Sequence, residues 1–307
     1  MGLLDGKVAI VTGAGHGIGR GHALELARQG ALVVVNDLGS SVRGEGADRA
    51  AEKTVALIEE RGGRAVANFG DVGDHEQAGS MVAQAVEEFG RLDVLVNNAG
   101  IVRDAAIWNL SVDDFDAVLR VHVRGTWSTC HHAATYWRAR AKAGESNVRG
   151  RIINTTSGAG LGGNFGQTGY ASAKAAVVGL TQTLALELHS IGVTVNAVGP
   201  SGLTRITATM PGMGESFEPD EIADDAFHPM DPANSSPLVA WLASEDAAMV
   251  SGQVLRSIED RIILMQGWRE LAAVCSNGKR WETAKLGGIL SQQLFGTRAP
   301  GMRFDPA

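Results

Sequence analysis

Tyr170, Lys174 and Ser157 are the residues whose types and spacing best fit acid–base chemistry. Tyr170 and Lys174 stand one helical turn apart in the run GNFGQTGYASAKAAVVG, and Ser157 lies thirteen residues before the tyrosine. A free phenol has a pKa of about 10, so a tyrosine that removes a proton near neutral pH needs its phenolate favoured. A lysine at i+4 on the same helix face supplies positive charge. Ser157 is suited to hydrogen-bond a substrate oxygen, although an ordinary helix start beside an unrelated serine is the alternative.

Seven strand-like runs separated by helical patterns predict an α/β fold. Several runs are nearly continuous in Val, Ile and Ala, which is typical of parallel strands covered on both faces. Repeated strand–helix units with short connections predict a doubly wound parallel sheet with right-handed crossovers and helices on both faces. The predicted strands span residues 7–13, 31–37, 64–72, 93–100, 151–157, 193–200 and 252–257.

Three segments stand outside this regular alternation. Residues 38–48 form a polar, glycine-rich loop, and residues 201–236 form a long irregular stretch of the kind that serves as a lid or binding loop. No linker or internal repeat divides the chain, so we expect a single domain over residues 1–257. Residues 258–307 are expected to be a C-terminal extension that packs on the same domain or on a partner subunit.

A glycine-rich turn joins the first strand-like run to the first helical pattern. The run VAIVTGAGHGIG places Gly13, Gly15, Gly17 and Gly19 between strand and helix, and Asp37 ends the next strand. Glycines let the backbone approach a ligand closely, and the helix N-terminus favours a negative pyrophosphate. In this context the pattern predicts a dinucleotide site, with a ligand-free glycine turn as the alternative.

Asp37 distinguishes between the two nicotinamide dinucleotides. A carboxylate at this strand end accepts hydrogen bonds from the hydroxyls of an adenosine ribose and repels a 2′-phosphate. Leu38 and Gly39 follow it, so no arginine stands ready for that phosphate and NAD is the predicted cofactor. Arg43, further along the loop, keeps NADP as the less favoured choice, and Asp37 as a simple turn cap is the alternative.

Polar residues at later strand ends extend the predicted site. Asp71 and Val72 are expected to flank an adenine, and Asn98 to hold backbone or ribose groups, because ligands of open α/β sheets bind outside the carboxyl ends of the strands. Asn97 is expected to be structural. The predicted cofactor contacts are Gly13, Gly15, His16, Gly17, Ile18, Gly19, Asp37, Asp71, Val72, Asn98, Ala99, Gly100, Tyr170, Lys174, Pro200 and Thr204.

The motifs TGAGHGIG, NNAG and YASAK, together with Ser157, resemble those of the short-chain dehydrogenase/reductase family in order and approximate spacing. The resemblance runs from about residue 5 to residue 257. It implies a seven-stranded Rossmann-like sheet and hydride transfer between a nicotinamide cofactor and a secondary alcohol or ketone. It also implies that Ser157, Tyr170 and Lys174 are catalytic and that the lysine holds the nicotinamide ribose.

His122 departs from the usual pattern of that family. Many members carry Asn in an N-V-x-G stretch, where it helps to organise a water-mediated proton path, whereas this chain reads HVRG. Either His122 substitutes in the relay or it is a structural histidine. His122 therefore belongs to the predicted catalytic residues only if it substitutes in the relay.

Longer stretches, including VVVNDLG, NNAGIVRD, VHVRG and GNFGQTGYASAKA, are similar to the (3R)-hydroxyacyl-CoA dehydrogenase domain of peroxisomal multifunctional enzyme type 2 and its bacterial relatives. That similarity implies an NAD-dependent dehydrogenase of a fatty or steroid side-chain acyl-CoA. The similarity places Thr204 in a segment that closes over the nicotinamide. The oligomeric states common in the family imply a homodimer or homotetramer. The alternatives are an NADPH-dependent 3-oxoacyl carrier-protein reductase or steroid ketoreductase, and a non-catalytic nucleotide-sensing protein.

The composition is that of an ordinary globular protein, with 44% hydrophobic and 20% charged residues and a net charge of −7. The negative charge argues against general nucleic-acid binding, and no apolar run reaches the roughly 18 residues of a membrane span. The strand-like run that begins at Lys7 leaves no room for a signal peptide, and Cys130 and Cys275 lack the spacing of metal ligands. We therefore expect a cytoplasmic protein that acts on a small molecule without a metal.

Overall fold

The computed structural model describes residues 2–46, 48–145, 148–209, 215–222, 226–268, 270, 272–278 and 280–293. Parts of the predicted loop at 201–236 and the last part of the predicted extension, residues 294–307, lie outside the described residues.

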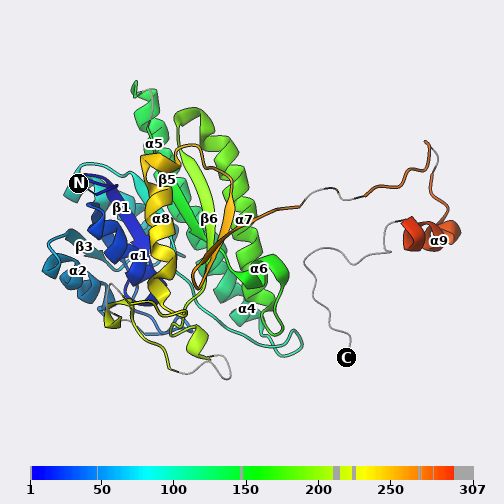
Figure 1. Cartoon of the computed structure of the whole chain (residues 1–307), viewed down its shortest axis with the longest axis horizontal. Helices are drawn as coiled ribbons and strands as arrows, with labels where there is room; N and C mark the ends of the chain where they lie inside the picture. Colours follow the sequence, from blue (N-terminus) through cyan, green and yellow to red (C-terminus); the bar gives the residue numbers. More distant parts are fainter. Residues whose placement is uncertain are drawn as a thin grey trace.

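An eight-stranded sheet forms the centre of the molecule (Figure 1). Its strand order is β3-β2-β1-β4-β5-β6-β7-β8, and every neighbouring pair is parallel except β7 and β8. The strands are β1 (Val8–Thr12), β2 (Leu32–Asn36), β3 (Arg64–Asn68), β4 (Val94–Asn97), β5 (Arg151–Thr155), β6 (Thr194–Pro200), β7 (Val254–Ile258) and β8 (Arg261–Met265).

The eighth strand shows that the expectation of seven strands was wrong. The chain reverses at Glu259, whose φ of 53° lies in the left-handed region, and returns antiparallel to β7. The register runs from Ile258 opposite Arg261 to Val254 opposite Met265. The hydrogen-bonding edge of β7 is thus paired by the chain itself rather than left open.

Alternating side chains on each strand fill two hydrophobic cores. In β1, Ala9 and Val11 pack into the core beneath α1, α2 and α8, whereas Val8 and Ile10 pack into the core beneath α3, α5 and α7. Helices therefore cover both faces of the sheet, as predicted for a doubly wound fold (Figure 1). The α-helices are α1 (Gly17–Arg28), α2 (Ala50–Glu60), α3 (His75–Phe89), α4 (Val112–Leu119), α5 (Thr126–Lys142), α6 (Gly158–Gly162), α7 (Thr168–Leu188), α8 (Ser236–Ala243) and α9 (Thr283–Gln293). The π-helical turn is η1 (Arg120–Gly125), and the 3₁₀ turns are η2 (His189–Ile191), η3 (Thr207–Thr209), η4 (Pro219–Glu221), η5 (Pro232–Ser235) and η6 (Glu245–Ala247).

The strand order reverses direction between β1 and β4. The carboxyl ends of these two strands border a crevice, which is where open α/β sheets bind their ligands. Thr12 joins the two ends, because its Oγ1 accepts hydrogen bonds from the backbone N–H groups of Asn98 at 3.0 Å and Ala99 at 3.1 Å.

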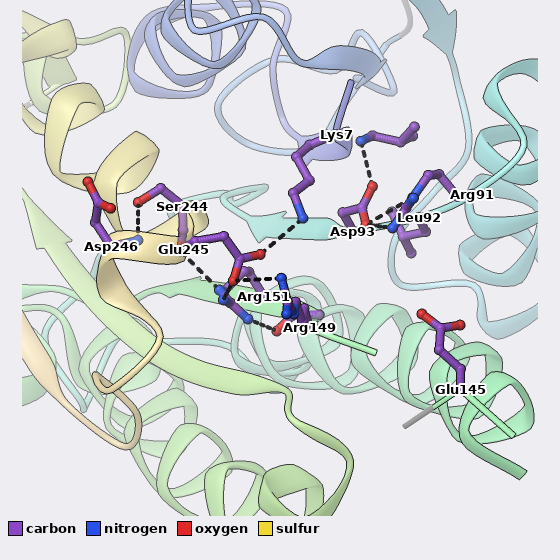
Figure 2. A network of polar contacts seen from close by, with 12 residues as sticks. Lys7, Arg91, Leu92, Asp93, Glu145, Arg149, Arg151, Ser244, Glu245 and Asp246 are labelled. Carbon is purple, nitrogen blue, oxygen red and sulfur yellow. Dashed lines mark hydrogen bonds and ion pairs between the residues drawn. The ribbon is translucent and has the colours of Figure 1, made fainter. Parts of the chain in front are cut away.

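A charged network ties the strands together at the opposite, amino-terminal edge (Figure 2). Glu245 lies between Lys7, at 3.1 Å, and Arg151, at 3.3 Å, and Asp93 accepts a hydrogen bond from the backbone N–H of Val8 at 2.9 Å. Burial lowers the pKa of Arg151, and the charge of Glu245 opposes this shift. The network joins β1, β4 and β5 at the edge remote from the crevice.

The chain beyond β8 leads to α9, which Figure 1 shows apart from the sheet. Trp268 in this stretch is fully exposed. That the extension packs on this domain or on a partner subunit stays a prediction. Among the described residues, no helix combines the length and apolar character needed to cross a bilayer.

Candidate active site

A cleft of about 400 Å³ opens at the carboxyl ends of β1, β2 and β4. The predicted cofactor residues that line it are Gly13, His16, Gly17, Ile18, Gly19, Asp37, Asp71, Val72, Asn98, Ala99, Gly100 and Thr204. Gly15, Tyr170, Lys174 and Pro200 are not among its lining residues. Of the other lining residues, Arg103, Arg120 and Arg205 are cations that were not predicted from the sequence.

The glycine-rich turn packs too closely on its neighbours to accept larger residues. A Cβ atom on Gly13, whose φ is 63°, would lie 2.7 Å from the Cα of Ala99, and one on Gly19 would lie 2.1 Å from the carbonyl oxygen of Gly13. The turn, the end of β4 and the start of α1 therefore form one continuous backbone wall. Such a wall lets a pyrophosphate approach the helix N-terminus.

Asp37 lies at the edge of the cleft, where the sequence predicted a ribose-binding carboxylate. Its two oxygens accept hydrogen bonds from the backbone N–H groups of Gly15 and Gly39, each at 2.8 Å. Arg43 also lines the cleft, but its guanidinium lies 3.9 Å from Asp114. The positive charge of Arg43 is thus shared with the carboxylate of Asp114.

The two asparagines after β4 have different surroundings. Asn97 is buried and donates a hydrogen bond to Asn154 at 2.9 Å, so the structural role expected of it is confirmed. Asn98 donates from its side-chain amide to the carbonyls of Thr12 at 3.1 Å and Gly13 at 3.0 Å. These bonds occupy the amide nitrogen of Asn98 and leave its Oδ1 as the atom available to a ligand.

Asp71 is held in place by its own loop and by an arginine. Its Oδ1 accepts a hydrogen bond from the N–H of Gly73 at 2.8 Å, and its Oδ2 is paired with Arg120. Val72 beside it lines the cleft. This places an apolar side chain and a fixed carboxylate together at this edge of the cleft, and their contact with an adenine stays a prediction.

Glu218 joins the segment after β6 to the glycine-rich turn, a contact that sequence reasoning missed. Its carboxylate accepts a hydrogen bond from the N–H of Gly17 and contacts His16 Nδ1, each at 2.6 Å, and nearby Arg20 is paired with Asp220 at 3.0 Å. Burial opposes ionisation of Glu218, but these hydrogen bonds and the charge of Arg20 lower its pKa. The segment around Glu218 has no periodicity, so the sequence carries no signal for this contact.

Ser157, Tyr170 and Lys174 meet where β5, α6 and α7 come together. Lys174 Nζ lies 5.7 Å from the centre of the Tyr170 ring and donates a hydrogen bond to the carbonyl of Thr155 at 2.8 Å. Ser157 caps α6, and its side chain hydrogen-bonds Tyr170. The helical spacing thus brings the three predicted catalytic residues into one cluster.

Burial governs the protonation of this cluster. It raises the pKa of Tyr170 to about 12, with the Ser157 hydrogen bond opposing the shift and the charge of Asp104 adding to it. It also lowers the pKa of Lys174 to about 7. The charge of Lys174 was expected to lower the pKa of the Tyr170 phenol. In the protein without ligands, burial has the larger effect and raises that pKa.

His122 packs against Tyr170 from a π-helical turn, η1, between α4 and α5. The two rings meet edge to face with their centres 5.2 Å apart, and His122 Nε2 lies 2.8 Å from the carbonyl oxygen of Ile101. Burial, and secondarily the charge of Lys174, lower the pKa of His122 to about 3 against the opposing effect of Ile101. The ring is therefore neutral at physiological pH; its Nε2 lies within hydrogen-bond distance of both the carbonyl oxygen and the N–H of Ile101, and its Nδ1 is buried without a partner among the described residues.

Asp104 is a second polar residue near the tyrosine that sequence reasoning did not single out. Its Oδ2 accepts a hydrogen bond from Gln167 at 2.7 Å, and burial raises its pKa against the opposing effect of that bond. The contact joins the loop after β4 to the start of α7. Asp104 could have been found from the sequence, because it is the acidic residue that ends the run NNAGIVRD shortly after the NNAG motif.

The sequence pattern of the family described as short chain dehydrogenase matches residues 7–213, which include the glycine-rich turn, Ser157, Tyr170 and Lys174. The chain is a short-chain dehydrogenase. It is therefore an oxidoreductase, and the family to which it belongs uses nicotinamide cofactors.

Comparison with known proteins extends this family relationship over nearly the whole chain. The short-chain dehydrogenase is 39% identical to the hydroxyacyl-CoA dehydrogenase ChsB1 of Mycobacterium tuberculosis over 98% of this chain and 92% of that protein. A crystal structure of a short chain dehydrogenase from Mycobacterium avium superposes with a TM-score of 0.86 at 45% identity, covering 99% of this chain and all of the other. The match to the peroxisomal multifunctional enzyme type 2 of Mus musculus is 40% identical over 78% of this chain but only 30% of that longer protein.

Proposed function

We propose that this short-chain dehydrogenase is an NAD-dependent (3R)-3-hydroxyacyl-CoA dehydrogenase acting on a fatty or steroid side-chain acyl group. The observation that carries the proposal is the clustering of Ser157, Tyr170 and Lys174 beside the cleft, in a chain that matches the hydroxyacyl-CoA dehydrogenase ChsB1 along nearly its full length. Asp37, a carboxylate at the edge of the cleft, supports NAD as the cofactor.

Each catalytic residue has one task in the oxidative direction. Tyr170 takes the proton of the C3 hydroxyl as its general base. Ser157 donates a hydrogen bond to the same substrate oxygen and fixes its position. The ammonium of Lys174 stabilises the phenolate of Tyr170, because an opposite charge close by favours the ionised form.

The residues of the cleft fit a nicotinamide dinucleotide. The backbone wall at Gly13 and Gly19 leaves no room for side chains, and Asp37 and the Oδ1 of Asn98 would hold the riboses. When bound, the oxidised cofactor accepts the hydride from C3. Thr204, from the segment after β6, faces Gly17 and closes the cleft over the turn.

Steady-state turnover, followed by the absorbance of the reduced nicotinamide, tests the proposal. NAD and NADP would each be offered with matched (3R)- and (3S)-3-hydroxyacyl-CoAs of short-chain, long-chain and steroid-bearing type. We expect turnover with NAD and the (3R) thioesters. Binding of NAD without turnover of any thioester would contradict the proposed substrate and leave the family assignment intact.

Replacement of Asp37 by Asn is expected to reduce the preference for NAD over NADP by about 10- to 100-fold in kcat/KM, because a charge-assisted hydrogen bond contributes about 1.5–3 kcal/mol. The neutral amide also removes the repulsion of a 2′-phosphate. Glu52→Gln, the same change of charge at an exposed residue of α2 outside the cleft lining, is the control. An unchanged cofactor ratio in Asp37→Asn would contradict the assigned role.

We propose that His122 is a positioning residue that acts through Tyr170 and the Ile101 backbone. His122→Asn is expected to lower kcat by less than about tenfold, below the 100-fold or greater loss typical of a missing general base, with KM for NAD nearly unchanged. Since the histidine is neutral, no change of the pH profile between pH 5 and 8 is expected. A loss as large as that of a tyrosine variant, or a lost titration in that pH range, would instead place His122 in the proton path.

Homo-oligomer formation also stays a proposal. Trp108, in the loop before α4, and Trp127, at the start of α5, are 73% and 46% exposed in the single chain, as a subunit interface in this region would require.

A further inference from the structure

Arg256 is a cation beside Gly158, the residue that follows Ser157. It lies in the middle of β7, opposite Gly199 of β6, and its flanking residues Leu255 and Ser257 are buried. In a run that otherwise reads as an apolar strand, a charged residue at this place requires an explanation.

Two glycines create the space that Arg256 occupies. A Cβ atom on Gly158 would lie 2.9 Å from a terminal nitrogen of the guanidinium, and one on Gly199 would lie 3.4 Å from Arg256 Cγ. Gly158 follows Ser157 directly and is the first residue of α6. The guanidinium is therefore in van der Waals contact with the residue next to the one assigned to the substrate oxygen.

Arg256 lacks the partners that other enclosed arginines of this chain possess. Arg20 is paired with Asp220 at 3.0 Å, and Arg151 with Glu245 at 3.3 Å, and each also donates to backbone carbonyls. By contrast, Arg256 Nε is buried without an acceptor, and the described part of the chain supplies no carboxylate or hydrogen-bond partner for the group. A guanidinium left unpaired in a partly buried place is costly, so an anion from outside the chain would be bound favourably.

We propose that Arg256 binds a carboxylate carried by the acyl chain of the substrate, so that the preferred substrates are 3-hydroxyacyl thioesters with a second, free carboxyl group. This inference rests on the proposed function. Arginine matches a carboxylate with two parallel hydrogen bonds, which gives both affinity and orientation. Because Arg256 lies next to the Ser157–Gly158 step, the anion it binds is only a few bonds from C3. The phosphates of CoA lie at the far end of the pantetheine arm and fit this place less well.

A matched pair of substrates tests the proposal: (3R)-3-hydroxyadipyl-CoA, which ends in a carboxylate, and (3R)-3-hydroxyhexanoyl-CoA, which ends in a methyl group. We expect the wild type to prefer the first by about 10- to 100-fold in kcat/KM, the range of a charged hydrogen bond. Arg256→Gln is expected to abolish that preference and to change hexanoyl turnover by less than about threefold. Arg256→Lys is expected to restore part of it.

Arg261→Gln is the control variant, since it removes an exposed arginine from the neighbouring strand β8 and is expected to keep the preference. Thermal melting of each variant verifies folding, and Arg256→Lys tests the assignment to this position if Arg256→Gln does not fold. No preference in the wild type, or the same preference in a folded Arg256→Gln, would overturn the proposal.

A second arm replaces CoA by N-acetylcysteamine, which removes the phosphates from both substrates. The preference for the carboxylate is expected to persist in this arm. If Arg256→Gln instead alters only the discrimination between CoA and N-acetylcysteamine thioesters, the anion is a CoA phosphate and the proposal is overturned. Absence of turnover with every thioester would overturn the proposed function as well, whereas turnover without a carboxylate preference would overturn this inference alone.

Discussion

Tyr170→Phe is expected to lower kcat for oxidation of a (3R)-3-hydroxyacyl-CoA by about 100- to 10,000-fold, the usual contribution of a general base. The variant loses only the hydroxyl that takes the substrate proton. The ring still packs against His122, whose ring centre lies 5.2 Å away, so the fold and the cofactor cleft are expected to stay intact. Initial rates at saturating NAD, with the affinity for NAD measured separately, isolate the chemical defect.

The chain offers a matched control for this variant, because Tyr136 is its other tyrosine. Tyr136 lies on α5 and packs against Arg140, away from Tyr170. Tyr136→Phe is expected to retain full activity. Near-complete turnover in Tyr170→Phe would remove the phenol from the mechanism.

Lys174→Met is expected to abolish most of the activity and, at the same time, to stabilise the protein near neutral pH by about 1–4 kcal/mol, the range found when buried ion pairs are replaced by apolar groups. Lys174 is 3% exposed, and burial lowers its pKa from 10.5 to about 7. Its site holds an ammonium for function at a cost in stability. Denaturant unfolding and steady-state kinetics of the same preparations measure both effects.

The stabilisation is expected to depend on pH in a defined direction. Below about pH 7, Lys174 is charged in the folded and unfolded states, so its burial penalty is complete. Between pH 7 and 10.5 the folded protein binds fewer protons than the unfolded chain, so wild-type stability rises with pH and the advantage of methionine shrinks. Lys53→Met, at an exposed position on α2, is the control and is expected to change neither property. A Lys174→Met protein that is less stable than the wild type at pH 6 would contradict the assigned burial cost.

The sequence predicted the parts of the fold that depend on local patterns. Near-continuous Val and Ile runs indicated the parallel strands because both of their faces are buried, as in β1 and β2. The glycine-rich turn and the spacing of Tyr170 and Lys174 were equally readable, since each follows from one strand–turn–helix unit. The strand β8 was missed because it exists only through its pairing with β7 after the reversal at Glu259.

Features that depend on contacts between distant segments could not be predicted from the sequence. Glu218 reaches the start of α1 from a loop two hundred residues further along the chain, and no pattern in that loop indicates where it folds. The direction of the Tyr170 pKa shift was also not predictable, because the sequence shows the nearby lysine but not the burial that outweighs it. Arg256 was visible as a charge within an apolar run, but its position beside Gly158 required the sheet register.

Transfer of an isotope from substrate to cofactor directly tests whether this enzyme moves a hydride from C3 of a hydroxyacyl thioester to NAD. The enzyme would be given NAD and a (3R)-3-hydroxyacyl-CoA carrying deuterium at C3, and the nicotinamide product would be analysed by mass spectrometry after a single turnover. We expect the deuterium to appear in the reduced nicotinamide, and Tyr170→Phe to transfer at least about 100-fold less of it in the same time. A reduced cofactor without deuterium, or no reduction of NAD by any hydroxyacyl thioester, would contradict it.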